Sequence, residues 1–436
     1  MRFTKLFAAV LCSLAALAAS GQNLRDEIAA NPGKSGGVYY VYTYDNSVLT
    51  PAPKGYKPFY ISHYGRHGSR WLLHDSEYDE VMAVFRAADA ANAFTERGRE
   101  VYGRVKRVYD DGINRGGDLS PLGAEQHREI AGRMYRNFPE VFRSGAVVDA
   151  QATLVVRCVL SMAAFCERLK ELNPRLEVSR TAGRRTTRYL NFYSKPTNPT
   201  LSREYLDFID KGGWQEEYER IGDRFVRPGR LMSELFADGE FVRTIDAQKL
   251  MKGLFYFAAD MQNVGLGISF YDLFTTDELY GLNVYDNYKY YVIRGPSPLN
   301  RRFPQYYAKA LLEDFLTRAD RAVEGGAVSA DLRFGHDGNL MTFVSLLQFE
   351  GCDVVESDPE KIAQMWPLYR ISPMAANIQL VFYRKKASDD VLVKFLYNER
   401  EVRIPVASDL APYYRWNDVR DFYRNVMENL PDPAGK

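Results

Sequence analysis

Apolar and aromatic residues gather in short, nearly continuous runs at several places along the chain, and turn residues bound them. Such runs are typical of strands that are buried on both faces of a sheet. Charged residues follow three of the runs directly, and this is where an open α/β sheet places its ligands. The runs predict strands at 38–44, 59–64, 152–156, 330–335, 377–384 and 391–397.

Helical spacing of apolar residues fills much of the chain between these runs. Ser120 is a suitable N-cap, and Pro121 fits the first helical position that follows it. After Arg157, apolar residues recur on one helix face at Cys158, Met162, Phe165 and Leu169. Further helices are predicted over 77–109, from Ser120 to about Phe138, and over 305–323.

The composition and the hydrophobic pattern of the chain change between about 177 and 295, where Arg and Tyr become frequent and strand patterns weaken. We therefore predict an α/β fold with a mixed central sheet flanked by helices and an inserted, mainly α-helical cap. Such an insertion commonly builds a cleft between two lobes. The expected domains are an α/β domain of 22–176 and 296–436 and a cap of 177–295, with helices near 201–218, 228–236 and 247–264.

The first 21 residues have the three parts of an export signal. Arg2 and Lys5 precede the apolar run from Leu6 to Ala19, and small residues then lead to Gln22. The run is shorter than the roughly 20 residues of a membrane span. We expect a mature protein that is soluble, has no membrane partner, and is either periplasmic or secreted.

The balance of charge limits the classes of partner. The chain has 57 Lys and Arg against 56 Asp and Glu, and without the signal its net charge would be about −1. Proteins that bind nucleic acid usually carry a basic excess, so no nucleic acid is expected as a partner. Recognition of an anion must then come from a local group of cations.

Cysteine usage excludes a scaffold built on disulfides, because only three cysteines follow the signal. Cys158 and Cys166 fall on one predicted helix and are not expected to pair with each other. A bridge from Cys352 to either of them stays open, and buried apolar thiols are favoured. No group of His and Cys has the spacing of a metal site, so we expect no metal and no cofactor.

The strand predicted at 59–64 runs into the sequence Arg66-His67-Gly68-Ser69-Arg70. The planar donors of Arg pair with phosphate oxygens, and glycine lets the backbone approach a ligand. A His can attack phosphorus and carry the phosphoryl group as a covalent intermediate. The pentapeptide therefore indicates phosphate chemistry, and its alternative is an Arg-rich surface turn.

Two other predicted strand ends carry residues that could join this motif. Arg157 follows the run at 152–156, and His336 and Asp337 follow the run at 330–335. Taken singly, Arg157 could form a surface salt bridge, His336 could be structural and Asp337 could cap a helix. If the three strands are neighbours in one sheet, all of these side chains meet at one edge.

With these motifs in this order, the chain resembles the histidine acid phosphatases, the second branch of the histidine phosphatase superfamily. That branch includes phytases, acid glucose-1-phosphatases and multiple inositol polyphosphate phosphatases. Residues 66–70 resemble its RHGxRxP signature, and 335–340 resemble its HD motif. The resemblance covers most of the mature chain and also includes 118–126, 153–165, 373–376 and 396–398.

This resemblance implies a phosphoric monoester hydrolase that acts on small anionic phosphate esters. His67 would be the nucleophile, and Asp337 would be the general acid and then the general base. Because Asp337 must carry a proton to protonate the leaving group, we expect an acidic optimum. The phosphate-binding residues would be Arg66, Arg70, Arg157 and His336.

The substrate stays open because the chain departs from the family pattern at two places. Leu72 stands where the signature has Pro, and the HD sequence at 336–337 is typical of phytases and glucose-1-phosphatases, whereas multiple inositol polyphosphate phosphatases carry HAE. Phytate or another inositol polyphosphate is favoured over a broad acid sugar phosphatase and over an inactive phosphosugar-binding protein. Four basic residues at the start of the cap could contact such a substrate or form a solvated face: Arg180, Arg184, Arg185 and Arg188. The sequence gives no oligomeric state.

Overall fold

The computed structural model describes residues 23–199, 201–386 and 388–433. The export signal predicted for 1–21 lies outside the described residues, so it stays a prediction. In the described part of the chain, no helix combines the length and the apolar character needed to cross a membrane.

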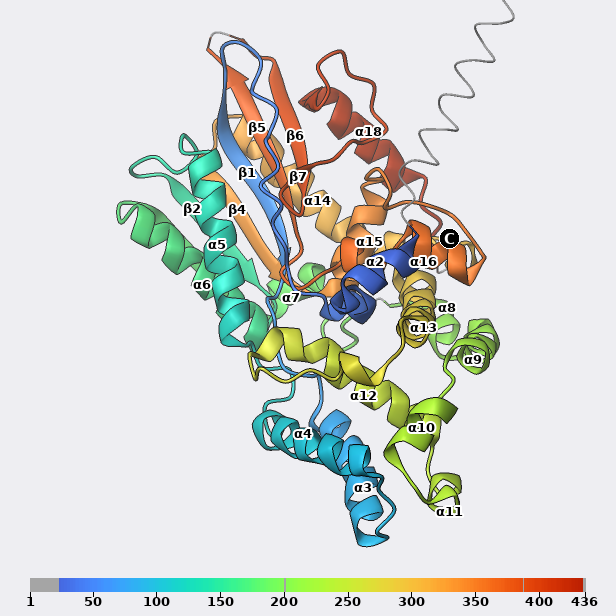
Figure 1. Ribbon diagram of the computed structural model, residues 1–436. Helices are drawn as coiled ribbons and strands as arrows, with labels where there is room; N and C mark the ends of the chain where they lie inside the picture. The colour runs from blue at the N-terminus through green and yellow to red at the C-terminus, as the bar shows by residue number, and fades with distance from the viewer. Residues whose placement is uncertain (1–22, 200, 387, 434–436) are drawn as a thin grey trace, which may run out of the picture.

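A mixed sheet forms the centre of the molecule, in the strand order β3-β2-β4-β1-β5-β6-β7, with β8 paired to β6 (Figure 1). The four strands from β3 to β1 are parallel, whereas β5 pairs antiparallel with β1 and with β6. The predicted fold class is confirmed. The strands are β1 (Tyr56–Arg66), β2 (Val147–Ala152), β3 (Glu177–Ala182), β4 (Val328–Gly335), β5 (Asn377–Lys385), β6 (Val391–Tyr397), β7 (Arg400–Glu401) and β8 (Tyr413–Arg415).

Two of the six predicted strands are wrong. The run at 152–156 begins at the last residue of β2, and Leu154 and Val156 in it are 50% and 64% exposed, because the chain turns there into a helix that begins at Val156. The run at 38–44 belongs to the 3₁₀ segment η1 (Pro32–Tyr39) and the irregular chain after it. Val38, Tyr39 and Tyr40 are buried, and η1 packs against helices instead of a sheet. A short apolar run alone does not distinguish the two.

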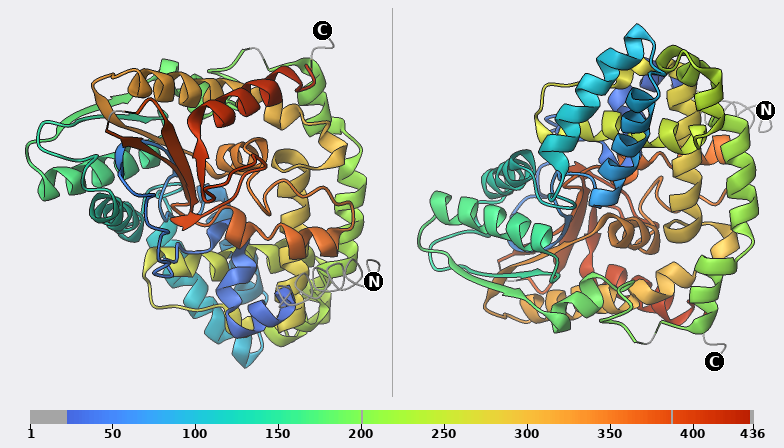
Figure 2. Two further views of the ribbon diagram at one scale, coloured as in Figure 1. Left: turned by 90° about the horizontal axis from the view of Figure 1, so that it is seen from above. Right: turned by 90° about the horizontal axis from the view of Figure 1, so that it is seen from below.

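Helices cover both faces of the sheet (Figure 2). On one face, α5 (Pro121–Asn137) and α6 (Val156–Leu172) pack over the side chains of Ile61, Leu332 and Phe334. The other face is covered by α14 (Phe303–Val323), α15 (Asp337–Leu346) and α18 (Trp416–Glu428). The start of α5 is as predicted, since the Ser120 side chain accepts a hydrogen bond from the Gly123 amide.

A helical lobe lies at the carboxyl ends of the parallel strands (Figure 1). The segment predicted as one helix at 201–218 is two helices, because Gly212 and Gly213 interrupt it and Gly213 has a φ of +75°. The helices of this stretch are α7 (Arg184–Leu190), α8 (Arg203–Lys211), α9 (Trp214–Phe225), α10 (Gly229–Leu235), α11 (Gly239–Arg243), α12 (Ala247–Val264) and α13 (Thr276–Arg294).

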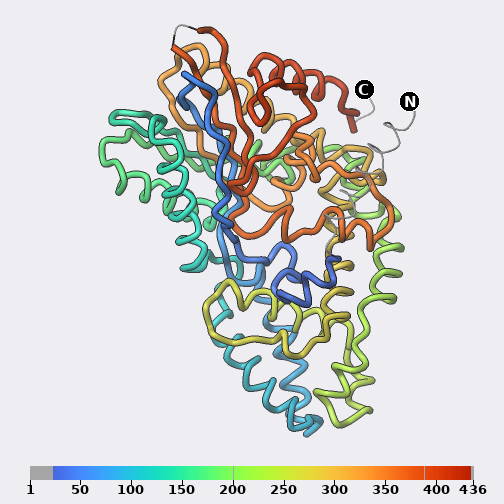
Figure 3. The backbone as a smooth tube through the Cα atoms, turned by 45° about the horizontal axis from the view of Figure 1, so that its top comes forward, coloured from blue at the N-terminus to red at the C-terminus, as the bar shows by residue number. Residues whose placement is uncertain are grey.

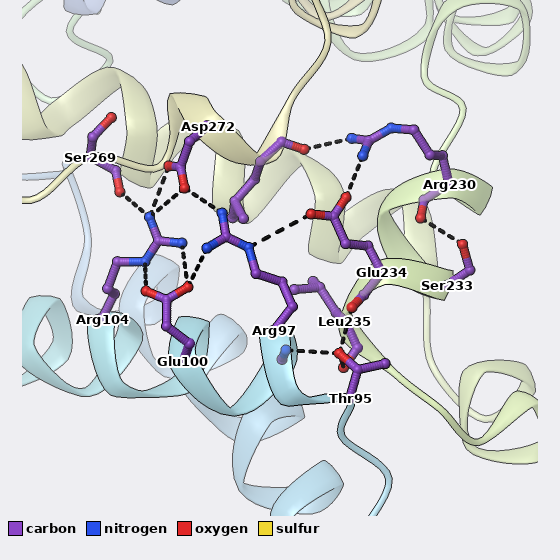
Figure 4. Close-up of polar contacts among 12 residues, drawn as sticks. Thr95, Arg97, Glu100, Arg104, Arg230, Ser233, Glu234, Leu235, Ser269 and Asp272 are labelled. Carbon is purple, nitrogen blue, oxygen red and sulfur yellow. Dashed lines mark hydrogen bonds and ion pairs between the residues drawn. The ribbon is translucent and has the colours of Figure 1, made fainter.

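Two features bear on the predicted domain boundaries, and the division itself stays a prediction. Residue 177 begins a strand of the main sheet, because β3 pairs with β2 along its whole length. The segment predicted as one helix at 77–109 is a pair, α3 (Asp75–Ala90) and α4 (Glu96–Gly112), and α4 packs on α10 of the helical lobe. Figure 4 shows their polar contacts, in which Arg97 and Arg104 share Asp272, in the short η2 (Tyr271–Leu273).

The N-terminal segment forms a strap across the helical lobe. It consists of α2 (Leu24–Ala30) and η1, which packs against α12 and α13 (Figure 3). Its backbone carbonyls bind distant residues: Val38 O accepts from Arg66, Tyr39 O from Asn263, and Tyr40 O from Met374. The remaining elements are η3 (Pro298–Asn300), α16 (Pro359–Met365) and α17 (Leu368–Ile371).

Candidate active site

The polar residues predicted from separate strands come together at the carboxyl ends of β1 and β4. These strands are parallel neighbours, and Arg66 pairs in register with Gly335. His67 follows β1, while His336 is the N-cap of α15 directly after β4. Arg157 corrects one expectation, because it lies in the first turn of α6 and not at the end of a strand.

His67 is held as a neutral imidazole, and within the described residues one of its two ring nitrogens has no hydrogen-bond partner. Its Nδ1 lies 2.9 Å from the carbonyl oxygen of Gly68, which can only accept, so Nδ1 carries the proton and the lone pair is on Nε2. Burial, together with the guanidiniums of Arg157 and Arg66, lowers the pKa of His67 well below its usual value. The ring centroids of His67 and His336 are 5.9 Å apart. This tautomer is the one that a nucleophilic imidazole needs.

The backbone after His67 packs too closely for a side chain at Gly68. A Cβ atom at Gly68 would lie 2.2 Å from the carbonyl oxygen of Gly123, in the first turn of α5. The Gly68 amide donates to Ser161 Oγ, and the Ser69 amide donates to Gln126 Oε1. The glycine thus lets the loop lie against α5 and α6, and this close contact fixes the direction of His67.

Arg66 is fully buried and connects three parts of the chain. Its Nη1 donates to the carbonyl oxygens of Val38 and Ser372, each at 2.6 Å. Its Nη2 lies 3.3 Å from Oδ2 of Asp337. Burial lowers the pKa of Arg66 to about 10, a value that leaves it charged at the pH of any ordinary assay.

The two other arginines approach from different sides. The guanidinium of Arg70 lies 4.9 Å from the ring centroid of Tyr39, and its Nη1 donates to the Trp71 carbonyl. Arg157 lies over the turn at Gly117, where a Cβ atom would be 3.2 Å from Nη1 of Arg157. The positive charges of both arginines lower the pKa of His67, as that of Arg66 does.

His336 and Asp337 complete the cluster from β4 and α15. Nε2 of His336 lies 3.2 Å from Oγ1 of Thr153. Burial, and after it the charge of Arg157, lowers the pKa of His336 to about 3. Burial alone would raise the pKa of Asp337, but Arg66 and Arg70 outweigh burial and bring that pKa to about 2. The side chain of Asp337 remains 25% exposed, so it can reach a group that enters from outside.

The basic residues predicted at the start of the cap are not part of this cluster. Arg180 lies on β3 and lines a surface hollow together with Cys166 of α6. Three exposed arginines lie on α7, and within the described part of the chain their side chains form no ion pair or hydrogen bond: Arg184, Arg185 and Arg188.

Several residues at the site escaped the sequence analysis. Tyr39, Asp260 and Asn263 approach the motif from the strap and from α12. Asp260 carried no local signal, because α12 also contains Lys249 and Lys252 at helical spacing from it, and this pattern does not place Asp260 in the core. The three described cysteines are buried and free, so Cys352 forms no bridge with Cys158 or Cys166.

Two further histidines are buried behind the motif, on the α5 and α6 face. His63 and His127 both pack against Phe334. Burial lowers the pKa of His63 well below its usual value, and it lowers that of His127 to about 3, although a backbone contact with Arg66 opposes this shift. The charged neighbours of His127 in the sequence favour a position on the surface of the helix, and this expectation is wrong because the residue is 1% exposed.

Acid is expected to destabilise the empty protein through His63 and His127. Because the pKa of each is lower in the folded state, the unfolded chain binds more protons below pH 6.5, and stability falls as the pH falls. The loss is about 1.4 kcal/mol per pH unit for each residue. In urea unfolding between pH 6.5 and pH 5 without phosphate, His127→Leu should lose about 2 kcal/mol less than the wild type. An equal loss in both proteins would contradict this, and His74→Ala is the exposed control.

The chain is similar in sequence to one protein family and in fold to several solved structures. A model of the histidine phosphatase superfamily (branch 2) matches residues 66–398. The multiple inositol polyphosphate phosphatase of Bifidobacterium longum, in complex with inositol hexasulfate, is similar in structure, with a TM-score of 0.76 and 20% identity over 88% of this chain and 96% of that chain. Its complex with phosphate has a TM-score of 0.77 and 20% identity, covering 92% and 100% of the two chains.

The phytase from D. castellii is similar to a lesser degree. Its TM-score is 0.63 at 14% identity, over 91% of this chain and 85% of that chain. At such identities the likeness to solved structures is one of fold. No curated protein matches the sequence.

Proposed function

The chain belongs to branch 2 of the histidine phosphatase superfamily, and from this premise we propose that His67 is the nucleophile of an exported inositol polyphosphate phosphatase. That the chain is a phosphoric monoester hydrolase follows from the family. The observation that carries the proposal for His67 is its buried, neutral ring with a free Nε2 among three guanidiniums.

In the first step, Nε2 of His67 attacks the phosphorus atom, and the bond to the ester oxygen breaks. Arg66, Arg70, Arg157 and His336 hold the phosphoryl oxygens, and these preorganised donors supply most of the catalysis. Asp337 gives its proton to the departing ester oxygen, which leaves as an alcohol. The products of this step are the free alcohol and a phosphohistidine at His67.

In the second step, water attacks the phosphorus atom of the phosphohistidine. Asp337, now a carboxylate, takes a proton from the water, and the bond between phosphorus and Nε2 breaks. His67 regains its lone pair, and inorganic phosphate leaves. Asp337 is suited to this double role because it is partly exposed and lies 3.3 Å from Arg66.

The preference for inositol polyphosphates rests on two kinds of support. The structure with inositol hexasulfate, which is that of a multiple inositol polyphosphate phosphatase, aligns with nearly the whole of both chains. The unpaired arginines of α7 offer cations outside the phosphoryl site. The HD sequence at 336–337 is typical both of phytases and of glucose-1-phosphatases, so the alternative is a broad sugar phosphatase.

A substrate panel tests the proposal. Phosphate release from phytate, glucose 1-phosphate and p-nitrophenyl phosphate is measured for the purified protein from pH 3 to pH 8. The proposal expects the highest kcat/KM for phytate. A preference for glucose 1-phosphate would favour the sugar phosphatase, and no release from any ester would favour the inactive binding protein.

The arginines of α7 should act only on substrates with several phosphates. Arg184→Ala combined with Arg185→Ala is expected to raise the KM for phytate about tenfold and to leave that for p-nitrophenyl phosphate unchanged, because only phytate extends beyond the phosphoryl site. Initial rates at one pH measure both. Equal losses on the two substrates, or none on either, would remove these residues from the substrate site.

The pH dependence should follow the substrate as much as the enzyme. The pKa of Asp337 is about 2 in the empty site, so above that pH the proton for the leaving group has to arrive with the ester, in its monoanionic form. The second pKa of a phosphate ester is about 6, so kcat/KM should fall tenfold per pH unit above that value. The pH at which kcat/KM begins to fall should therefore differ between two esters whose second pKa values differ. If kcat/KM begins to fall at the same pH for both esters, the titrating group belongs to the protein.

Export to the periplasm or beyond is also part of the proposal. It is supported by the charged, apolar and small-residue parts of 1–21. Cell fractionation with N-terminal sequencing should find the protein outside the cytoplasm, beginning near Gln22. A full-length protein in the cytoplasm would refute export, but it would not affect the assignment of His67 as the nucleophile.

A further inference from the structure

A further arginine lies beside the proposed general acid, at the end of a helix of the helical lobe. Arg294 is the last residue of α13, and Gly338 is in the first turn of α15, directly after Asp337. A Cβ atom at Gly338 would lie 3.1 Å from Nε of Arg294. The guanidinium therefore lies close to the backbone of this turn, and the absence of a side chain at Gly338 leaves room for it.

The guanidinium of Arg294 is fixed by aromatic residues of the helical lobe. Its central carbon lies 3.8 Å from the ring centroid of Tyr193, and its Nη1 donates to the hydroxyl of Tyr205 at 2.7 Å. The backbone is held as well, because Thr342 Oγ1 donates to the carbonyl oxygen of Arg294 at 2.8 Å. A ring face and a phenol restrict the orientation of a guanidinium, but they do not neutralise its charge.

The charge of Arg294 has no counterion among the described residues. The side chain is half-buried, and its hydrogen bonds go to a hydroxyl and a backbone carbonyl, with no ion pair to a described carboxylate. The next two arginines along the chain differ, because Arg301 pairs with Glu204 and Arg302 binds Asp353 through two nitrogens. Arginine is rarely buried without a partner, so an anionic ligand would complete this environment.

The face of α13 that carries Arg294 borders the catalytic cluster. Asp286, Tyr290 and Arg294 are half-buried and follow each other at four-residue steps, so they lie on one side of the helix. Burial raises the pKa of Tyr290, and the charge of Asp337 adds to this rise. Burial would lower the pKa of Arg294, but Tyr205, Tyr193 and Asp337 raise it above its usual value. Arg294 is therefore charged at any assay pH.

We propose that Arg294 binds a second phosphate, one that the departing alcohol carries next to the ester that is cleaved. The inference deepens the proposed function and rests on Asp337 as the general acid. The departing oxygen must come within about 3 Å of Asp337 to receive its proton. A phosphate on the neighbouring carbon is then close to Gly338, where the planar donors of Arg294 can pair with its oxygens. The enzyme thus prefers esters whose alcohol is itself phosphorylated.

Esters with and without a neighbouring phosphate test this role. The value of kcat/KM is measured at pH 5 for phytate, in which every ester has phosphorylated neighbours, and for myo-inositol 1-phosphate and p-nitrophenyl phosphate, which have none. Arg294→Met should lower kcat/KM about thirtyfold for phytate and less than about threefold for the other two, because it removes charged hydrogen bonds to the second phosphate alone. Equal losses on all three esters, or no loss on phytate, would overturn the inference.

Arg243→Met is the matched control for the loss of one positive charge. Arg243 is an exposed residue of α11, at the end of the helical lobe that lies away from the sheet (Figure 1). Because salt screens exposed charges at such a separation, kcat/KM for each ester should stay within about twofold of the wild type. A loss on phytate as large as that of Arg294→Met would also overturn the inference.

A second variant keeps the test decisive if Arg294→Met does not fold. Arg294→Lys retains the charge but not the planar fork, so it should lower kcat/KM about fivefold for phytate alone. A loss shared by all three esters would again count against the second phosphate site. If the wild type releases no phosphate from any ester, the proposed function itself fails. If the wild type hydrolyses all three and the variants lose activity equally on each, only the role of Arg294 fails.

Discussion

Replacing His67 by Ala is expected to lower kcat for p-nitrophenyl phosphate by at least about 10⁴-fold, because removal of a nucleophile abolishes the covalent route. The three guanidiniums would remain, so the variant should still bind inorganic phosphate. Steady-state kinetics and phosphate inhibition measure the two properties separately. An intact inhibition constant with lost turnover identifies a group that reacts, as opposed to one that binds.

His74→Ala is the matched control for this experiment. It also removes an imidazole close to the motif, but His74 is exposed at the start of α3. Its kcat should stay within a factor of two of the wild type. Rapid quenching of the wild type should also trap a phosphoenzyme that is stable in alkali and labile in acid. Turnover of the His67 variant near the wild-type rate would exclude the mechanism.

Replacing Asp337 by Asn is expected to have an effect that depends on the leaving group. An alkyl phosphate needs a proton on its departing oxygen, so its kcat should fall about 10³-fold. p-Nitrophenolate leaves without a proton, so its first step should suffer far less. The measurement is the ratio of kcat values for an alkyl and an aryl ester in both proteins, and it separates acid catalysis from a general loss of structure.

The burst of p-nitrophenol reports the second function of Asp337. If the carboxylate activates water, Asp337→Asn should accumulate phosphoenzyme, and a burst should precede a slower steady state. The ion pair with Arg66 gives the control, because its loss should weaken phosphate binding for all substrates alike. Equal losses for alkyl and aryl esters, without a burst, would show that Asp337 only holds Arg66 in place.

The sequence was most informative where local rules decide structure. The nearly continuous apolar run at 59–64 predicted the strand that leads to Arg66, and the Ser120-Pro121 pair predicted the start of α5. The pattern at 152–156 misled because an apolar run can lie exposed in a turn, so that Arg157 reaches the site from a helix. The order of the motifs indicated that their residues form one cluster. The structure shows how they meet, because β1 and β4 are parallel neighbours.

The residues that lie around the catalytic cluster could not be predicted from the sequence, for a different reason. Tyr39 and Asp260 are far from the motif in sequence, and nothing in their local patterns points toward Arg70. Contacts of this kind follow from how a whole lobe packs on a sheet.

The anchoring of Arg66 also sets the time at which activity appears during synthesis. His67 leaves the ribosome early, while the carbonyl of Ser372 and the backbone of Ala375 and Ala376, which hold Arg66 and His67, are made some 300 residues later. A growing chain therefore has its nucleophile long before it has the parts that orient it. Because such long-range contacts form late in folding, a partly made chain should have no hydrolytic activity.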